Sequence, residues 1–563
     1  MKKVFALILA AIFALSCLYG CTITSKKALY QEALNQLEQI QPNFDGTCNN
    51  NQALLQAIYN EEFIEPKNFI FMIGDGMGFN AVKAAQLTYK DKLYNSTLAM
   101  NSLPIQSSQS TYSASSETTD SAAGGTALST GHKTSNSTIA MNKDATESYK
   151  TTLELAAEKG KSTGLVATKS ITDATPASFS AHVSTRGQQT QIAAQQLQKM
   201  ADGSLDLVLG GGASFYEDAQ NAEYLQAAEE NGLTYTKNWD EAANAALPLA
   251  GLFATGQLDT QNAPSVARMT DLALSLLAED ENGFFLMVEG SQIDSGGHAN
   301  DLEYETRELY DFDDAVAIAM RFVAFNPDTV LIITADHETG GLHLPFDTTA
   351  ENLQDTHYYT TGGHTYVNVP VYALGYGTEA LAGANENTDL AIFVANLMGE
   401  ETFGTKSNTD MLIDISDEST QSKFMAENPD NVEDNSILCK QESIQFTLCE
   451  DNPDFVIPID AFLTAPADIV NPRKIHFTVS NPTDQPISLP NFEISTRRDL
   501  FLLNCAFDTL EPNETRTITY IIPYAICQDK FEGLYSLTFL YEEAEPTTIE
   551  ISDFYVTERG IND

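Results

Sequence analysis

The sequence predicts an α/β protein with two folded units: a largely parallel β-sheet sandwiched by helices, followed by an all-β sandwich. Between residues 65 and 404, continuous apolar runs alternate with stretches rich in Ala, Leu and Gln. Such runs are typical of parallel strands that are buried on both faces. Between residues 438 and 563, short segments of alternating polarity are separated by turn residues, which favours an immunoglobulin-like sandwich. The length of 563 residues agrees with two units, because one hydrophobic core rarely supports so long a chain.

Six apolar runs supply the strands expected in the parallel sheet. They occupy residues 68–74, 162–168, 205–212, 283–290, 329–336 and 367–375. Sheets of this kind bind their ligands beyond the carboxyl ends of the strands. We therefore look for the active site among the polar residues that follow these runs.

The segments outside the two units differ in composition. Residues 1–21 are expected to be an export signal, because two lysines precede an apolar run that ends in small residues. The last four of them resemble a bacterial lipoprotein box, so a lipidated Cys21, which would tether the protein to a membrane, and an ordinary cleaved signal both remain open. Residues 22–64 are interpreted as a spacer with a lead-in helix, and the polar residues 405–437 as a linker. We expect a periplasmic or extracellular protein.

Charge and cysteine content restrict the partners and the redox setting. The 78 acidic and 30 basic residues give a net charge of −48, which argues against nucleic acid as a partner, since phosphate backbones require a basic footprint. Cys439, Cys449, Cys505 and Cys527 lie in the β-rich unit, where three disulfide pairings are open, and Cys48 is left over. No segment after the signal has the ~20 uninterrupted apolar residues of a membrane span.

Two segments in the first half of the α/β region suit phosphate chemistry. Asp75 stands in a Gly-Asp-Gly-Met-Gly turn, where glycine lets the backbone fold beneath the carboxylate. Ser121 follows Asp120 at an expected helix start, where backbone N–H groups and the helix dipole favour an anion. Taken alone, each is also what an ordinary turn or helix cap contains.

A third segment adds a phosphate-binding side chain. Asp173 and Thr175 follow the run at 162–168, and His182 and Arg186 stand four residues apart, on one face if their segment is helical. An arginine fork can hold two phosphate oxygens at once, although a lone arginine is more often simply solvated.

Carboxylates and histidines combine at the later strand ends. Mixed carboxylate and imidazole ligands suit zinc, whereas any single histidine is as well explained by a structural role. The side chains concerned are Glu289, Asp294, His298, Asp336, His337 and His364.

Taken in order, these motifs resemble the alkaline phosphatase family over about residues 65–400. The motifs are Gly-Asp-Gly-Met-Gly, Thr-Asp-Ser-Ala-Ala, Asp-Ala-Thr-Pro-Ala, Val-Glu-Gly with Ile-Asp, Thr-Ala-Asp-His and Gly-Gly-His-Thr. The resemblance implies an alkaline phosphatase-like fold and the hydrolysis of small phosphate monoesters through a phosphoserine at Ser121. Dimerisation is common in the family, so a homodimer is compatible with the resemblance, although the residues themselves give no information on it.

The resemblance also implies two zinc ions and one magnesium ion. The first zinc would be held by Asp294, His298 and His364, and the second by Asp75, Asp336 and His337. Magnesium would be held by Asp75, Thr175 and Glu289, with Asp173 acting on it through water, while Arg186 would clamp the phosphate. Two metal ions ~3.5–4 Å apart can activate a serine and hold the leaving oxygen. Such chemistry needs no protein general base, and no histidine stands beside Ser121 in the sequence.

The sequence departs from the family pattern at one position, and two other functions remain open. Ser295 stands where many family members carry Lys, His or Trp, so turnover and pH optimum cannot be inherited from relatives. The first competitor is a phosphodiesterase or sulfatase of the same superfamily, although the modified residue that sulfatases need lies in a motif absent here. The second is a cell-surface binding protein with an inactive phosphatase domain, in which the β-rich tail carries the function.

Overall fold

The structure is a computed structural model, and it describes most of the α/β region and parts of the β-rich region. The described residues are 26–39, 52–345, 348–382, 384–400, 402–404, 409–412, 422, 425, 428, 437–440, 443–449, 454–457, 472–487, 491–496, 500–503, 510–521, 534–540 and 546–558. The expected signal at 1–21 and Cys48 lie outside them, as does most of the expected linker at 405–437.

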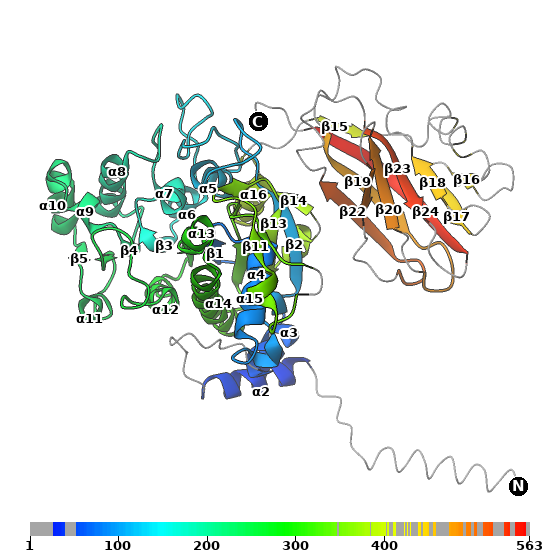
Figure 1. The fold of residues 1–563 in the computed structure, drawn as a ribbon. Helices are drawn as coiled ribbons and strands as arrows, with labels where there is room; N and C mark the ends of the chain where they lie inside the picture. Colours follow the sequence, from blue (N-terminus) through cyan, green and yellow to red (C-terminus); the bar gives the residue numbers. More distant parts are fainter. Residues whose placement is uncertain are drawn as a thin grey trace, which may run out of the picture.

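A ten-stranded sheet forms the centre of the α/β region (Figure 1). Nine of its strands run parallel to one another, and β13 runs antiparallel to both of its neighbours. The strands lie in the order β14 (Ala384–Glu386), β2 (Ile105–Ser110), β13 (Val369–Leu374), β8 (Thr329–Thr334), β1 (Asn68–Gly74), β7 (Phe284–Gly290), β3 (Ser162–Ser170), β4 (Leu207–Gly211), β6 (Leu249–Leu252) and β5 (Thr234–Thr236). The prediction of a largely parallel sheet is confirmed, and all six predicted runs are strands of it.

Helices cover both faces of this sheet, as Figure 1 shows. Successive side chains of β1 point to opposite faces, so Phe69, Phe71 and Ile73 enter one core while Ile70 and Met72 enter the other. The core of Ile70 includes residues of α4 (Phe79–Tyr89), α12 (Val266–Leu277) and α14 (Leu302–Phe325). The core of Phe69 includes residues of α5 (Ser121–Thr130), α6 (Thr152–Glu158), α7 (Ala174–Ser180), α8 (Gln189–Asp202), α10 (Ala222–Glu230) and α16 (Asn387–Leu397).

Shorter elements complete the α/β region. Two small antiparallel ribbons pair β9 (Glu338–Thr339) with β12 (His364–Thr365), and β10 (Leu342–His343) with β11 (Tyr358–Tyr359). The short helices are α9 (Ala213–Tyr216), α11 (Trp239–Ala242), α13 (Ile293–Ala299) and α15 (Leu353–Thr356).

Two helices precede the sheet, in the segment expected to hold a spacer and one lead-in helix. They are α2 (Lys26–Leu37) and α3 (Gln52–Asn60), which lie side by side (Figure 1). Ala33 and Leu37 are buried in the same core as α14, and the Tyr30 hydroxyl donates to the Ala324 carbonyl at 2.7 Å. These helices are therefore packed on the α/β region.

The β-rich region contains two antiparallel sheets. One has the order β16 (Ile437–Cys439), β17 (Ser443–Leu448), β24 (Thr547–Glu558), β19 (Pro472–Ser480) and β22 (Thr515–Ile521), with β15 (Thr409–Leu412) also paired to β24. The other has the order β18 (Asp454–Ile457), β23 (Leu534–Leu540), β20 (Asn491–Thr496) and β21 (Leu500–Leu503).

Aromatic side chains join these two sheets. Phe446 of β17 stacks on Phe455 of β18 with ring centroids 3.8 Å apart, and Phe477 of β19 meets Phe539 of β23 edge-on at 5.6 Å. The two sheets therefore pack face to face, which confirms an all-β unit; the immunoglobulin-like topology stays a prediction. Of the four cysteines expected here, Cys439 and Cys449 form no disulfide with each other or with any other described residue, and the other two lie outside the described residues.

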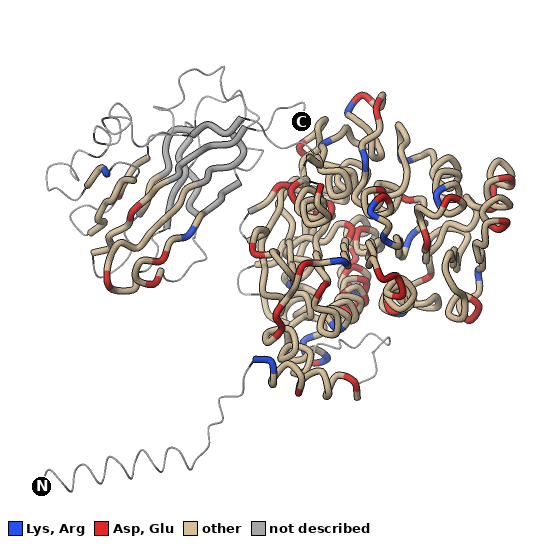
Figure 2. Tube along the Cα trace, turned by 180° about the vertical axis from the view of Figure 1, so that it is seen from behind, with Lys and Arg blue, Asp and Glu red and all other residues tan. Residues whose placement is uncertain are grey.

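The acidic residues are spread over many elements of the α/β region and do not form one face (Figure 2). This distribution is that of a solvated exterior. None of the helices in the described part of the chain combines the length and apolar character that a bilayer span requires.

Candidate active site

Neighbouring parallel strands deliver candidate residues to one edge of the sheet. β8, β1, β7 and β3 lie side by side, and their carboxyl ends meet at this edge. Asp75 follows β1, Asp336 and His337 follow β8, and Glu289 is the penultimate residue of β7. All four side chains are buried. These four predicted residues therefore lie together at the carboxyl ends of the strands, and their chemical roles stay a prediction.

Three helices supply further side chains. Ser121 is the first residue of α5, and Asp120 is its N-cap, with a carboxylate that accepts the Ala123 N–H at 3.1 Å. Asp173 is the N-cap of α7, and Thr175 lies in its first turn. The remaining helical pair, Asp294 and His298, lies four residues apart on α13. The helix cap interpretation was therefore correct for Asp120, and it leaves Ser121 at the positive end of the helix dipole.

Two glycines allow these elements to approach one another. Gly76 has a φ of 73°, and a Cβ there would lie 2.7 Å from the Thr339 hydroxyl and 2.9 Å from the Asp294 Cα. A Cβ on Gly124 of α5 would lie 2.9 Å from the Asp336 carbonyl oxygen. Larger residues at these positions would push apart the elements that carry the candidate side chains.

One cluster of possible metal ligands contains Asp294, His298 and His364, whose ligand atoms lie within 4.8 Å of one another. The Nδ1 atom of His298 faces the Gly362 carbonyl at 2.8 Å, and that of His364 faces the Thr119 carbonyl at 2.9 Å. A carbonyl only accepts, so both Nδ1 atoms carry hydrogen. Both Nε2 atoms are then directed into the site, 3.2 Å apart. Two imidazole nitrogens that face each other beside a carboxylate require a cation between them, either a proton or a metal ion.

A second cluster contains Asp75, Asp336 and His337, again within 4.8 Å. The Nε2 atom of His337 lies 3.2 Å from Asp336 Oδ2 and 3.5 Å from Asp75 Oδ1. Thr339 joins this cluster to the first one, because its hydroxyl donates to Asp294 Oδ1 at 2.8 Å and lies 3.2 Å from His337 Nδ1. Since the hydroxyl donates to the carboxylate, it accepts from His337, so Nδ1 carries the hydrogen and Nε2 keeps its lone pair for a metal.

The nucleophile candidate lies against the second cluster. The Ser121 hydroxyl oxygen is 3.1 Å from His337 Nε2 and is only 3% exposed as a residue. The sequence shows no histidine beside Ser121, but the fold brings His337 to it from 216 residues away. A metal ion held by the second cluster would therefore have Ser121 as a neighbour.

The electrostatics of the two clusters favour the binding of cations. Burial, together with the charges of Asp294 and Asp336, raises the pKa of Asp75 to about 8. Burial also raises the pKa of Asp336 to about 6 and lowers that of His337 to about 3. Burial acts against a charged His364, but the hydrogen bonds to Asp294 and to the Thr119 carbonyl, together with the charges of Asp294 and Asp75, outweigh burial and raise the pKa of His364 to about 9. Crowded carboxylates thus hold protons that a divalent cation would displace.

Buried oxygens without partners mark where cations fit. Asp75 Oδ1, Asp336 Oδ2 and Thr175 Oγ1 are all buried and have no hydrogen-bond partner among the described residues. Unsatisfied buried oxygens are costly, and metal coordination is one way to satisfy them. Glu289 is fully buried as well, and burial followed by the charge of Asp75 raises its pKa well above the ordinary value. The residues present therefore fit the expected metals.

The arginine expected to bind phosphate is held by two carboxylates. Arg186 Nη2 lies 3.0 Å from Asp173 Oδ1, and its Nη1 lies 3.3 Å from Asp120 Oδ2. The guanidinium is thus fixed beside the residue that precedes Ser121. The Arg186 side chain remains 31% exposed, so it can reach a ligand.

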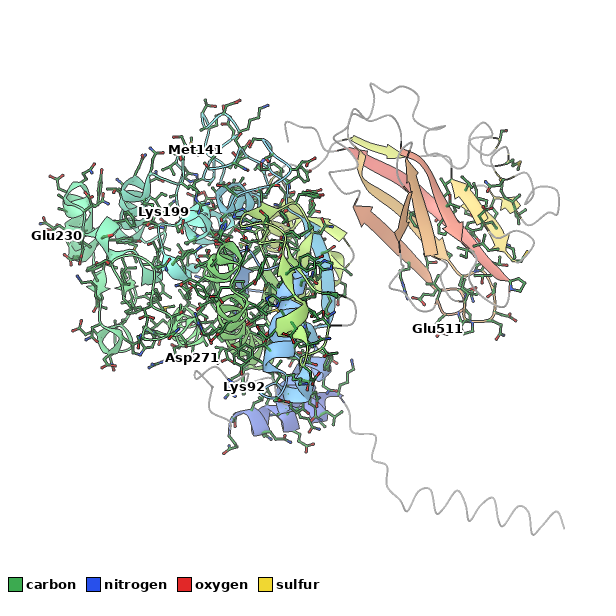
Figure 3. All side chains as sticks on the ribbon, in the orientation of Figure 1. Lys92, Met141, Lys199, Glu230, Asp271 and Glu511 are labelled. Carbon is green, nitrogen blue, oxygen red and sulfur yellow. The ribbon has the colours of Figure 1, made fainter. Side chains whose placement is uncertain are left out.

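The conditional prediction that His182 and Arg186 share a helical face is wrong. Helix α7 ends at Ser180, and the segment that follows is irregular. His182 turns away to bond Glu154 through Nε2 at 2.8 Å, and Lys199 (Figure 3) joins the same carboxylate at 2.6 Å. His182 is therefore a structural residue.

Two residues of the site were missed from the sequence. Thr339 is a short polar residue on β9, and nothing local marks it as a bridge between the clusters. Lys169 Nζ lies 3.0 Å from Asp294 Oδ2 and 3.5 Å from Asp75 Oδ2, and its side chain is only 14% exposed. A lysine among predicted metal ligands at a strand end was a detectable signal, since Lys169 follows the run at 162–168.

Comparison with known proteins settles the family. The family model described as alkaline phosphatase matches residues 66–357. The chain belongs to the alkaline phosphatase family. Alkaline phosphatase 3 of Bacillus subtilis (strain 168) is 35% identical over 409 residues, which cover 58% of this chain and 88% of that protein. Alkaline phosphatase of Escherichia coli (strain K12) is 30% identical over 398 residues, which cover 58% and 84%.

Solved structures of the family agree with this fold. Alkaline phosphatase from the Antarctic bacterium TAB5 is 33% identical and superposes with a TM-score of 0.54, covering 60% of this chain and 99% of its own. A mutant of that enzyme is known with Mg bound in the M3 site. Family membership makes the present protein a metal-dependent phosphatase that acts on phosphate monoesters.

Proposed function

We propose that the protein hydrolyses phosphate monoesters through a phosphoserine at Ser121, in a site that holds two zinc ions and one magnesium ion. The observation that carries this proposal is the position of Ser121. Its hydroxyl begins α5 and lies 3.1 Å from His337 Nε2, next to two groups of three ligands. A serine in such surroundings is suited to attack a phosphorus atom and then to be released again.

The types of donor atom support assigning zinc to two of the ligand sets and magnesium to the third. Asp294, His298 and His364 offer mixed carboxylate and imidazole ligands, as zinc prefers. The set Asp75, Asp336 and His337 has the same character and has Ser121 as a neighbour. The third expected set is Asp75, Thr175 and Glu289, which offers oxygen only and thus suits magnesium. Asp173 would act on that ion through water.

The bound metals would concentrate positive charge around the phosphoryl group, which lowers the pKa of the serine hydroxyl and stabilises the leaving oxygen. Ser121 Oγ forms a bond to phosphorus while the ester P–O bond breaks and the alcohol departs with a proton. Arg186 holds two phosphoryl oxygens through its fork during this transfer. Water then attacks phosphorus, the bond to Ser121 Oγ breaks, and the products are inorganic phosphate and the restored hydroxyl.

Monoesters are favoured over diesters because of charge. A monoester carries one more negative charge than a diester, and Arg186 together with three cations would offset that charge. The test is hydrolysis of an aryl phosphate against the matching diaryl phosphate by the full-length protein. Faster monoester cleavage is expected, and faster diester cleavage would replace this proposal with the phosphodiesterase alternative.

The nucleophile is tested by substitution. Ser121→Ala should lower kcat by at least about 10³-fold, because covalent catalysis is lost. Ser129→Ala is a matched control: Ser129 lies on the same helix α5, is buried, and donates to the Ser178 carbonyl. Full activity in Ser121→Ala would overturn the assignment, and a purified protein without zinc would revive the hypothesis of a binding protein.

We also propose the arrangement of the remaining chain. Residues 1–21 would direct export to the periplasm or the exterior, with or without a lipidated Cys21. Residues 65–404 would form the catalytic domain, which is in keeping with the family match at 66–357. Residues 405–437 would link it to the β unit at 438–563, with one stretch of that linker, β15 (Thr409–Leu412), paired to β24 of the β unit. The default role of the β unit is that of a scaffold or spacer.

A further inference from the structure

Lys169 introduces a positive charge among the expected metal ligands. It lies at the end of β3, and its ammonium is 3.0 Å from Asp294 Oδ2 and 3.5 Å from Asp75 Oδ2. The side chain is largely buried, with 14% of its surface exposed. The charges of Asp173 and Glu289 act on it as well. Among the described residues, no other lysine is paired with Asp294 or Asp75.

The ammonium occupies one particular side of Asp75. The Oδ1 atom of Asp75 faces His337 Nε2 at 3.5 Å, which is the side of the second cluster. The Oδ2 atom faces Lys169 instead. A carboxylate that bridges two metals uses one oxygen for each of them. Lys169 therefore contacts the oxygen that a third ion would need.

The rest of the expected third site is present and approachable. Thr175 Oγ1 is buried and has no hydrogen-bond partner in the described part of the chain, and Glu289 accepts from the Ser291 hydroxyl at 2.7 Å. A cavity of about 380 Å³ is lined by Lys169, Asp173, Gln189 and Ser214. Hydrated cations can thus reach the side of the site on which Lys169 lies.

We propose that Lys169 is a tethered cation that competes with the third metal ion for Asp75 Oδ2. This inference rests on the proposed two-zinc plus magnesium site, and it adds that the third ion binds more weakly than the two zinc ions. The two ions held by the histidine clusters bind tightly, while the third binds only when it displaces the ammonium from Asp75. Two cations cannot share one carboxylate oxygen without strong repulsion, so occupancy by Lys169 and by the third ion exclude each other.

The competition can be measured as metal affinity, without recourse to catalysis. The full-length protein is freed of metal with a chelator, loaded with zinc, and dialysed; zinc per chain is then counted by plasma mass spectrometry. Mg²⁺ is titrated into the loaded protein by calorimetry. Lys169→Met removes the charge while keeping the chain length, and Lys169→Arg keeps the charge. Lys150→Met is a matched control, because Lys150 is half exposed and pairs with Glu158 outside the clusters.

We expect two zinc ions per chain in all four proteins. The Mg²⁺ dissociation constant should fall by at least about tenfold in Lys169→Met, because a single neighbouring charge changes cation affinity by that factor or more. Lys169→Arg and Lys150→Met should bind Mg²⁺ as the wild type does. An unchanged or weaker Mg²⁺ affinity in Lys169→Met would overturn the competition.

The zinc count distinguishes a failure of the proposed competition from a failure of the proposed function. A wild-type protein that fails to retain two zinc ions would refute the proposed function, whereas two zinc ions with no effect of Lys169→Met would refute the competition alone. Lys169→Gln, which keeps a hydrogen-bond donor toward Asp294, guards against a folding defect in Lys169→Met. Loss of zinc in folded Lys169→Gln would show that Lys169 supports the ligands, and would also overturn the competition.

Discussion

Thr339→Val should weaken both histidine-containing clusters at once, although Thr339 is not expected to touch any metal. Its hydroxyl donates to Asp294 Oδ1 at 2.8 Å and accepts from His337 Nδ1 at 3.2 Å, in a fully buried position. Valine has nearly the same shape but lacks the hydroxyl. Asp294 would lose a donor, and His337 would lose the partner that fixes its tautomer.

The size of the effect follows from these two lost bonds. Partners that orient metal ligands are worth about 10- to 100-fold in metal affinity. This corresponds to about 1.4–2.7 kcal/mol, since each tenfold change is about 1.4 kcal/mol. Zinc affinity is measured by competition with a coloured chelator, and kcat is measured on an aryl phosphate at saturating zinc.

A matched control separates this effect from general damage. Thr306→Val removes another buried threonine hydroxyl, which donates to the Leu302 carbonyl within α14. It should leave zinc affinity unchanged. Equal zinc affinity in Thr339→Val and the wild type would refute the inference that Thr339 orients the ligands of both clusters.

Three further predictions concern stability. In the chelated protein the pKa values of Asp75 and His364 are raised to about 8 and about 9, so near neutral pH the folded state holds protons that the unfolded state has released. The urea concentration at the unfolding midpoint should therefore decrease as the pH rises from 7 to 9, and a midpoint that does not change with pH would contradict this. Gly76→Ala should cost about 1–3 kcal/mol, because alanine at a φ of 73° is strained, and an unaltered midpoint would show that the turn adapts. Lys133→Met should cost about 3–5 kcal/mol, because it removes the ammonium that lies 3.1 Å from the buried Glu386 carboxylate; adding Glu386→Gln should recover most of the loss.

The strands of the parallel sheet were predictable because their apolar runs are continuous. The run at 68–74 coincides with β1, and the run at 329–336 contains β8. The direction of β13 was not predictable, because an apolar run does not encode whether its strand is parallel or antiparallel. Strand β2 was missed because Ile-Gln-Ser-Ser-Gln-Ser contains a single apolar residue and so lacks a hydrophobic pattern.

The candidate site was predictable as a set of residues, and its internal contacts were not. The motifs around Asp75 and Ser121 could be identified because each combines a reactive side chain with small neighbours, and the motif at Asp336 because a histidine follows the carboxylate directly. The pairing of Lys169 with Asp294 joins positions 125 residues apart, and only the fold shows it. The same holds for His337 beside Ser121, since proximity in space follows from the strand order.

The proposed phosphoserine at Ser121 can be tested directly by trapping it. The full-length, zinc- and magnesium-loaded protein is mixed with an aryl phosphate, quenched in acid within the first turnover, digested, and mapped by peptide mass spectrometry. We expect one added phosphoryl group on the peptide that contains Ser121, and none in Ser121→Ala. An active wild-type enzyme that never carries phosphate on Ser121, or that carries it on another residue, would contradict the account.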